Sequence, residues 1–149
     1  MRAVVQRVKE AFVSVEGNVI GQIEKGLVVF LGVAEGDTMD DVEYIAKKII
    51  GLRVFEDEEG KMNKSLQEVE GELLIISQFT LLGDVRKGFR PSFVQAAKPD
   101  EAKKLYEALI QICKGKVKKV EKGQFQAHML INVLNDGPVT ILIDSKKQF

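Results

Sequence analysis

Apolar residues along this chain occur mostly in short runs separated by polar or glycine-containing segments, a pattern typical of β-strands. Residues 27–33 are apolar at nearly every position and predict a strand buried on both faces. Residues 73–76 form a similar run. Further strands are predicted over residues 3–8, 11–15, 19–23, 52–55, 117–120, 126–134 and 139–143, with a charged loop at 56–64 and a turn at 135–138.

Two segments have apolar residues at helical spacing instead. Asp37 and Thr38 can cap a helix that Gly51 ends, and Pro99 begins a second helix that closes at Lys114–Gly115. Because two helices interrupt many strands, we expect a single α+β domain over residues 1–149. Its sheet is predicted to be mixed and mostly antiparallel, with both helices on one face.

The segment 73–93 turns from apolar to polar within a few residues and predicts a binding site. Its strand ends in Ser77, Gln78 and Thr80, with Phe79 between them. Polar groups at the end of a buried strand need partners, so they point to a polar pocket. A glycine-containing loop follows, and such a loop can bind an anionic ligand; its charged residues are Asp84, Arg86, Lys87 and Arg90.

Composition limits the partners and the compartment. The formal net charge is zero, so any nucleic-acid contact must be a local patch. The lysines between residues 114 and 122 are expected to be solvated. Cys113, the only cysteine, is predicted to be a buried apolar residue. The longest apolar run, 26–34, is shorter than the ~18 residues that span a bilayer, and no signal-peptide core is present, so we expect the cytosol and no membrane contact.

Familiar catalytic sets are missing from the sequence. His128 is the only histidine, has no second ligand for a metal, and is expected to be a structural or surface residue. Ser77 and Thr80 have no evident base, and their periodicity fits a strand cap as well as a functional role. Gly137–Pro138 fits an ordinary trans turn, although carbonyls exposed at such a turn could also recognise a ligand.

Two longer motifs nevertheless identify a family. Residues 77–81, SQFTL, and 135–140, NDGPVT, match the SQFTL and NxGPVT motifs of D-aminoacyl-tRNA deacylases. Residues 86–93, RKGFRPSF, and the opening MRAVVQRV are also similar to that family, so the resemblance runs from Met1 to about Asp144. One position departs from the pattern, since Gln126 stands where the family usually has glycine.

The resemblance implies a homodimeric hydrolase without metal or cofactor. It would cleave the ester that joins a D-amino acid, or glycine, to the terminal adenosine of tRNA, which is chirality proofreading in translation. Gly137 and Pro138 would form a Gly-cisPro motif that enters the partner subunit's pocket and rejects L-residues. Arg7 would steady this motif. The pocket would be formed by Ser77, Gln78, Phe79, Thr80 and Met129, and the candidate RNA contacts are Arg86, Lys87 and Arg90.

The mechanism has two candidates. Thr80 could be a nucleophile, but the sequence places no base beside it. We favour stabilisation of the oxyanion by backbone N–H groups near Phe79 and Thr80, with help from a ribose hydroxyl of the tRNA or a water that it positions. Two other functions remain as alternatives: a non-catalytic nucleic-acid-binding protein with the same fold, and a general esterase with a Thr or Ser nucleophile.

Overall fold

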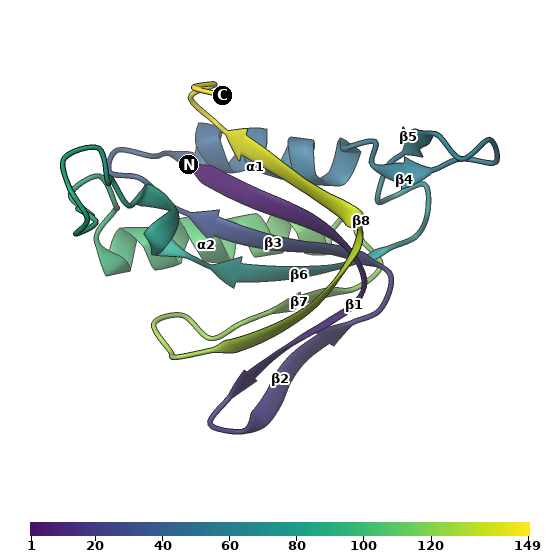
Figure 1. The fold of residues 1–149 in the computed structure, drawn as a ribbon, viewed down its shortest axis with the longest axis horizontal. Helices are drawn as coiled ribbons and strands as arrows, with labels where there is room; N and C mark the ends of the chain where they lie inside the picture. Colours follow the sequence, from purple (N-terminus) through teal and green to yellow (C-terminus); the bar gives the residue numbers. More distant parts are fainter.

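Strand β1 (Arg2–Val15) organises the sheet, because three strands pair with it. The computed structural model describes all residues from 1 to 149. One edge of β1 pairs with β3 (Gly26–Gly32) and then with β2 (Asn18–Ile23), and the other edge pairs with β8 (Leu130–Asp144). All three pairings are antiparallel. Figure 1 shows how the long strands β1 and β8 curve together across the molecule.

The other half of the sheet is parallel. Strand β6 (Glu72–Ser77) lies between β3 and β7 (Val120–Lys122) and runs parallel to both. The residues of β3 and β6 are buried at nearly every position, as expected for strands covered on both faces. The strand order is therefore β2-β1-β3-β6-β7, with β8 on β1.

Two helices cover part of this sheet. Helix α1 (Met39–Gly51) begins with a capping box formed by Thr38 and Asp41, and α2 (Pro99–Lys114) begins with a proline in its first turn. Their apolar faces enter one core cluster together with alternate residues of β1, β3 and β6. The alternate residues on the opposite side of these strands form a second, smaller cluster.

The structure confirms the predicted α+β class with two helices and a mixed sheet in one domain. Cys113 is fully buried in α2, also as predicted. No helix is both long enough and apolar enough to cross a membrane.

Several predicted boundaries are wrong. Residues 52–54 are not a strand, and the loop at 56–64 is closed by a short pair, β4 (Phe55–Glu56) and β5 (Met62–Lys64). The strand predicted at 117–120 begins only at Val120. The largest correction is β8, which runs as one strand from Leu130 to Asp144 where two strands and a turn were predicted, while residues 126–129 lie outside it, in the turn and loop that precede it.

Candidate functional site

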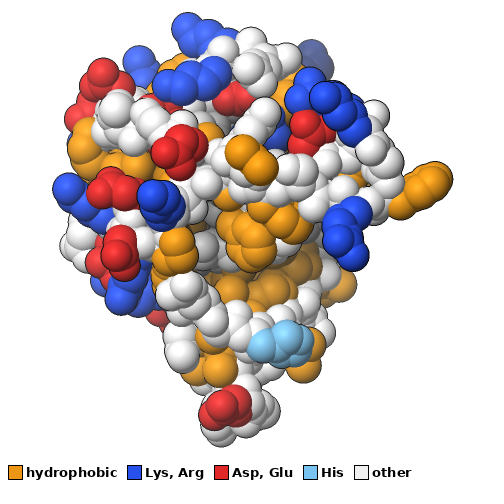
Figure 2. Space-filling view, turned by 90° about the vertical axis from the view of Figure 1, so that its left-hand side faces the viewer, with side chains coloured by type: hydrophobic (Ala, Val, Ile, Leu, Met, Phe, Trp, Pro, Cys, Tyr) orange, Lys and Arg blue, Asp and Glu red, His pale blue; other side chains and the backbone are white.

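A cavity of about 740 Å³ lies at the carboxyl ends of β3 and β6. In Figure 2 it is the hollow with hydrophobic side chains in the middle of the face. Three segments besides the strands form its wall: the start of a short 3-10 helix, the loop before α2, and the turn after β7. Its lining residues are Leu31, Val33, Ile76, Ser77, Gln78, Phe79, Phe93, Ala96, Ala97, Pro99, Ala102, Phe125, Gln126, Ala127, His128, Met129 and Ile131.

The polar end of β6 changes directly into this 3-10 helix, η1 (Phe79–Leu82). Ser77 still pairs with Leu31, and the N–H of Gln78 donates the last bond of the ladder to the Leu31 carbonyl at 2.7 Å. Gly32 then lets η1 approach β3 closely, because a Cβ at Gly32 would lie 2.6 Å from Leu82 Cδ2 and 3.0 Å from the Gln78 carbonyl oxygen.

Two backbone N–H groups at the start of η1, those of Phe79 and Thr80, have no partner within the helix. The N–H of Leu81 donates to the Gln78 carbonyl at 3.2 Å, and the N–H of Gly83 donates to the Thr80 carbonyl at 3.0 Å. Phe79 and Thr80 begin the helix, so no earlier carbonyl of the helix can accept from their N–H groups. These donors are suited to an oxygen that becomes negative during a reaction. The exposed Thr80 hydroxyl accepts a hydrogen bond from the Gln78 side-chain amide.

An aromatic pair forms one side of the cavity. The rings of Phe79 and Phe93 lie 5.0 Å apart, edge to face at 65°. The loop between these residues is held at its base, where the backbones of Asp84 and Ser92 exchange two hydrogen bonds of 2.8 and 2.9 Å. Phe93 therefore has a fixed position beside Phe79.

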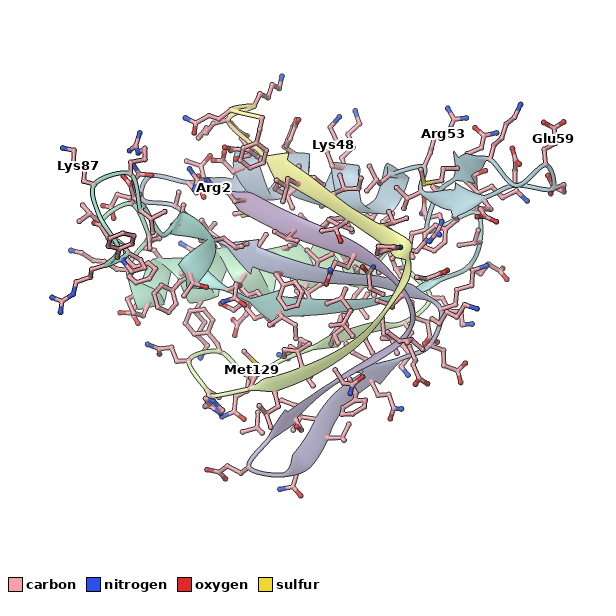
Figure 3. The ribbon with its side chains drawn as sticks, viewed as in Figure 1. Arg2, Lys48, Arg53, Glu59, Lys87 and Met129 are labelled. Carbon is pink, nitrogen blue, oxygen red and sulfur yellow. The ribbon has the colours of Figure 1, made fainter.

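The three candidate RNA contacts lie in that loop, but their charges differ in availability. Arg86 forms two bonds to the Asp84 carboxylate, Nε to Oδ1 at 2.9 Å and Nη2 to Oδ2 at 2.7 Å. The hydrogen bonds from Arg86 hold the pKa of Asp84 well below its usual range. Lys87 and Arg90 are exposed and form no ion pair, and Figure 3 shows Lys87 pointing away from the molecule. They are the free cations of the loop.

The turn after β7 forms the opposite side. Gln126 has a left-handed backbone with φ of +62°, and this explains why a glycine is expected there. Behind the turn, the rings of Tyr106 and Phe125 lie 5.9 Å apart, and the Tyr106 hydroxyl donates to the Ile75 carbonyl at 2.8 Å. Burial raises the pKa of Tyr106, so its hydroxyl stays neutral.

His128 corrects one premise of the sequence analysis. Its side chain is exposed, as predicted, but it lines the cavity, as Met129 does. We expected no base beside Thr80 and only a structural or surface role for His128, but the turn after β7 places the His128 side chain at the cavity. No group of three or more His, Cys, Asp or Glu side chains is placed to hold a metal ion.

The Gly137–Pro138 peptide bond is cis and lies on a bulge of β8. Asn135 pairs with Val8 and Thr140 pairs with Gln6, so five steps along β8 face two along β1. The Arg7 guanidinium, which is buried, supports this bulge. Arg7 Nε donates to the Asp136 carbonyl at 3.3 Å and lies 3.5 Å from the Asp136 carboxylate, while Nη1 donates to the Val54 carbonyl at 2.6 Å.

The bulge and the cavity are far apart within one chain. The bulge lies opposite Arg7, and Arg7 pairs with Leu27 of β3. Ser77 pairs with Leu31, which lies four residues, or about 13 Å, further along β3. Three strand spacings, about 14 Å, separate β8 from β6. The separation is therefore about 20 Å, and the exposed Gly137 does not line the cavity.

The predicted residues thus form three groups. The cavity brings together Ser77, Gln78, Phe79 and Met129, with Thr80 next to it in η1. Arg7, Gly137 and Pro138 form the bulge, and Arg86, Lys87 and Arg90 form the loop. Sequence reasoning assigned no role to Phe93 or His128, although the RPSF segment that contains Phe93 was a signal.

Comparisons with known proteins identify the family of this chain. The family model for D-Tyr-tRNA(Tyr) deacylase matches residues 4–144. Proteins named D-aminoacyl-tRNA deacylase from Clostridium novyi (strain NT) and Thermosipho africanus (strain TCF52B) are 59% and 60% identical over 149 residues, which is 100% of each chain.

Two solved structures have a similar fold. A protein described as c-Myc DNA Unwinding Element Binding Protein has a TM-score of 0.92 and 40% identity, covering 97% of this chain and 98% of that one. A probable eukaryotic D-amino acid tRNA deacylase has a TM-score of 0.78 and 18% identity, covering 95% and 97%, and this likeness concerns the fold alone.

Proposed function

Because the chain belongs to the D-Tyr-tRNA(Tyr) deacylase family, we propose that it hydrolyses the ester between a D-amino acid, or glycine, and the terminal adenosine of tRNA. The observation that carries this proposal is the cavity at the end of β6, where two free backbone donors border an apolar hollow. The enzyme would act in the cytoplasm, in proofreading during translation, and the reaction requires no cofactor.

The cavity suits the terminal adenosine and the ester carbonyl together. Twelve of its seventeen lining residues are hydrophobic, which favours a flat base over a charged group. The aromatic pair of Phe79 and Phe93 offers a surface for that base. With the base there, the ester lies near the start of η1.

The reaction begins when a water attacks the ester carbonyl carbon. The carbonyl oxygen becomes an oxyanion, which the N–H groups of Phe79 and Thr80 stabilise. The C–O bond to the ribose then breaks, the ribose oxygen takes the proton that the attacking water gives up, and the free amino acid leaves. A neighbouring ribose hydroxyl positions this water. In this scheme the water is the nucleophile and the Thr80 hydroxyl is not.

Substitutions separate the possible roles. Thr80→Ala should keep most of the activity if the backbone donors act, whereas a loss of several orders of magnitude with intact binding of a substrate mimic would make Thr80 the nucleophile. His128→Gln tests the imidazole at the cavity. A loss of activity in His128→Gln by several orders of magnitude, with intact binding of a substrate mimic, would replace the RNA-assisted step by general base catalysis.

We further propose that the active unit is a homodimer in which the bulge of one chain enters the cavity of the other. Two observations support this. The separation of about 20 Å keeps Gly137 and Pro138 from the cavity of their own chain. Strand β8 also exposes large apolar side chains, Leu130, Leu134 and Leu142, that a second chain would cover. The carbonyls of Gly137 and Pro138 would exclude L-side chains.

The first test compares release of tyrosine from D-Tyr-tRNA and L-Tyr-tRNA. We expect release from the D form alone, and its loss in a Gly137→Ala, Pro138→Ala double variant. A Gly36→Ala variant is the matched control, because Gly36 also has a positive φ, +81°, but its added Cβ would meet nothing within 4 Å. No release from either substrate, with tRNA still bound, would refute the deacylase.

A second candidate function comes from one comparison. The structure with a TM-score of 0.92 and 40% identity is described as a DNA unwinding element binding protein, so DNA binding without hydrolysis is the alternative. It would require tight DNA binding and no turnover of D-Tyr-tRNA. The other alternative, a general esterase, would use a Thr or Ser nucleophile, and a fluorophosphonate would label that residue covalently.

A further inference from the structure

Phe89 lies at the tip of the loop between Asp84 and Ser92 and is the most exposed large apolar residue of the chain. Its relative exposure is 105%, so its ring touches almost nothing. It follows Gly88, whose φ of +131° turns the backbone at this point. The backbone pair between Asp84 and Ser92 holds the base of the loop. An aromatic ring is thus presented to solvent on a loop with a fixed base.

The charges around Phe89 indicate what such a ring would contact. Lys87 and Arg90, on either side in the sequence, are the two free cations of the loop, because Arg86 is paired with Asp84. Figure 2 shows Lys and Arg side chains beside the hydrophobic hollow of the cavity face. An exposed aromatic ring between cations is the arrangement that binds single-stranded nucleic acid, with bases stacked on the ring and phosphates near the cations.

The loop is also continuous with the cavity. Phe93 lines the cavity and touches Phe79, and it lies four positions after Phe89, a reach of at most about 14 Å. Stacked nucleotides rise ~3.4 Å each, so this reach covers a few nucleotides. The strand that enters the cavity with its terminal adenosine therefore passes within reach of Phe89.

We propose that Phe89 is a stacking site for an unpaired nucleotide that precedes the terminal adenosine of the bound RNA, with Lys87 and Arg90 contacting the adjoining phosphates. The inference rests on the proposed function and adds a positioning residue to it. Phe89 touches no reacting atom, so it should affect binding of the RNA and leave the chemical step unchanged.

The binding test uses two RNA probes: a hairpin with an acceptor-like stem and an unpaired 3′ NCCA end, and the same hairpin with a blunt end. Phe89→Ala should bind the first probe about 5- to 150-fold more weakly, the range expected for loss of one stacked base. Phe89→Leu should be equally weak, because a leucine fills space but does not stack. Binding of the blunt probe should be unchanged, and Phe89→Trp should restore the parent affinity.

Two further readouts identify stacking itself. The chain has no tryptophan, so Phe89→Trp introduces a single reporter whose fluorescence should be quenched by the NCCA hairpin, while Val19→Trp, exposed on β2, should not respond. Phe89→Ala should leave the salt dependence of binding unchanged, whereas Lys87→Gln should lower the slope of log K against log salt by about 0.7.

The proposal is overturned if Phe89→Ala binds the NCCA hairpin within twofold of the parent, if it loses equal affinity for the blunt hairpin, or if Phe89→Leu binds normally. Turnover of D-Tyr-tRNA distinguishes this failure from failure of the proposed function. A parent enzyme that releases D-tyrosine while Phe89→Ala shows unchanged KM and kcat would refute the stacking site alone. A raised KM at an unchanged kcat is the expected result.

Discussion

Gly32→Ala tests whether the close approach of η1 to β3 places the N–H groups of Phe79 and Thr80 that we propose to stabilise the oxyanion. The added Cβ would lie 3.0 Å from the Gln78 carbonyl oxygen and 3.1 Å from Leu81 Cβ, where ordinary contact begins at 3.4 Å, so the start of η1 must move by at least 0.4 Å (3.4 minus 3.0). A misplacement of ~1 Å can cost about 100-fold in rate. We therefore expect the single-turnover rate constant for D-Tyr-tRNA to fall about tenfold, and overpacking to cost about 1–3 kcal/mol of unfolding free energy.

The assay is single-turnover release of D-tyrosine at saturating enzyme, with a urea titration of the same protein. Gly51→Ala is the control, because Gly51 ends α1 and its added Cβ would meet nothing within 4 Å. That variant should keep its rate and gain up to about 1 kcal/mol. A Gly32→Ala protein that is destabilised but releases D-tyrosine at the parent rate would refute the argument that η1 positions the donors.

Three more predictions concern stability and pH. Gln126→Gly should raise the free energy of unfolding in urea by about 0.5–1 kcal/mol, because it relieves the left-handed backbone at φ +62°; a decrease would contradict this. Asp37→Asn should lower it by about 3–5 kcal/mol, because the buried Met1 ammonium, 2.8 Å from the Asp37 carboxylate, loses its charged partner; an unchanged urea midpoint would contradict it. Burial raises the pKa of Cys113 from 9.0 to about 12. The stabilisation that follows from this is complete below pH 9.0 and is lost as the pH rises toward 12, so Cys113→Val should lose less stability over that interval than the parent.

The elements that the sequence predicted well are those whose signal is local. The helices have their caps and apolar stripes in consecutive turns, so Thr38, Gly51 and Pro99 marked their ends closely. The polar end of β6 was recognisable because Ser77 and Gln78 follow a run with no other polar residue. In each case a few neighbouring residues determine the structure.

Strand β8 was mispredicted because its continuity depends on another strand. Gly137–Pro138 removes a donor and resembles a turn, yet β1 holds both sides of the interruption in register. The Asn135 side-chain amide replaces missing ladder bonds, since Nδ2 donates to the Arg7 carbonyl at 2.9 Å and to the Val139 carbonyl at 3.0 Å. A pattern of apolar positions along one segment contains no signal for a bond made to a residue more than a hundred positions away.

The candidate site follows the same rule at a larger scale. Each motif specifies a local structure. SQFT ends a strand in a short helix with free N–H donors, and NDGP makes a bulge that Arg7 supports. The strand order decides where these two structures lie relative to each other, because β3 and β1 lie between β6 and β8. Since this order separates them by about 20 Å, and since both motifs match one family, the proposal that two chains share a site needs both the motifs and the topology. Neither one supports it alone.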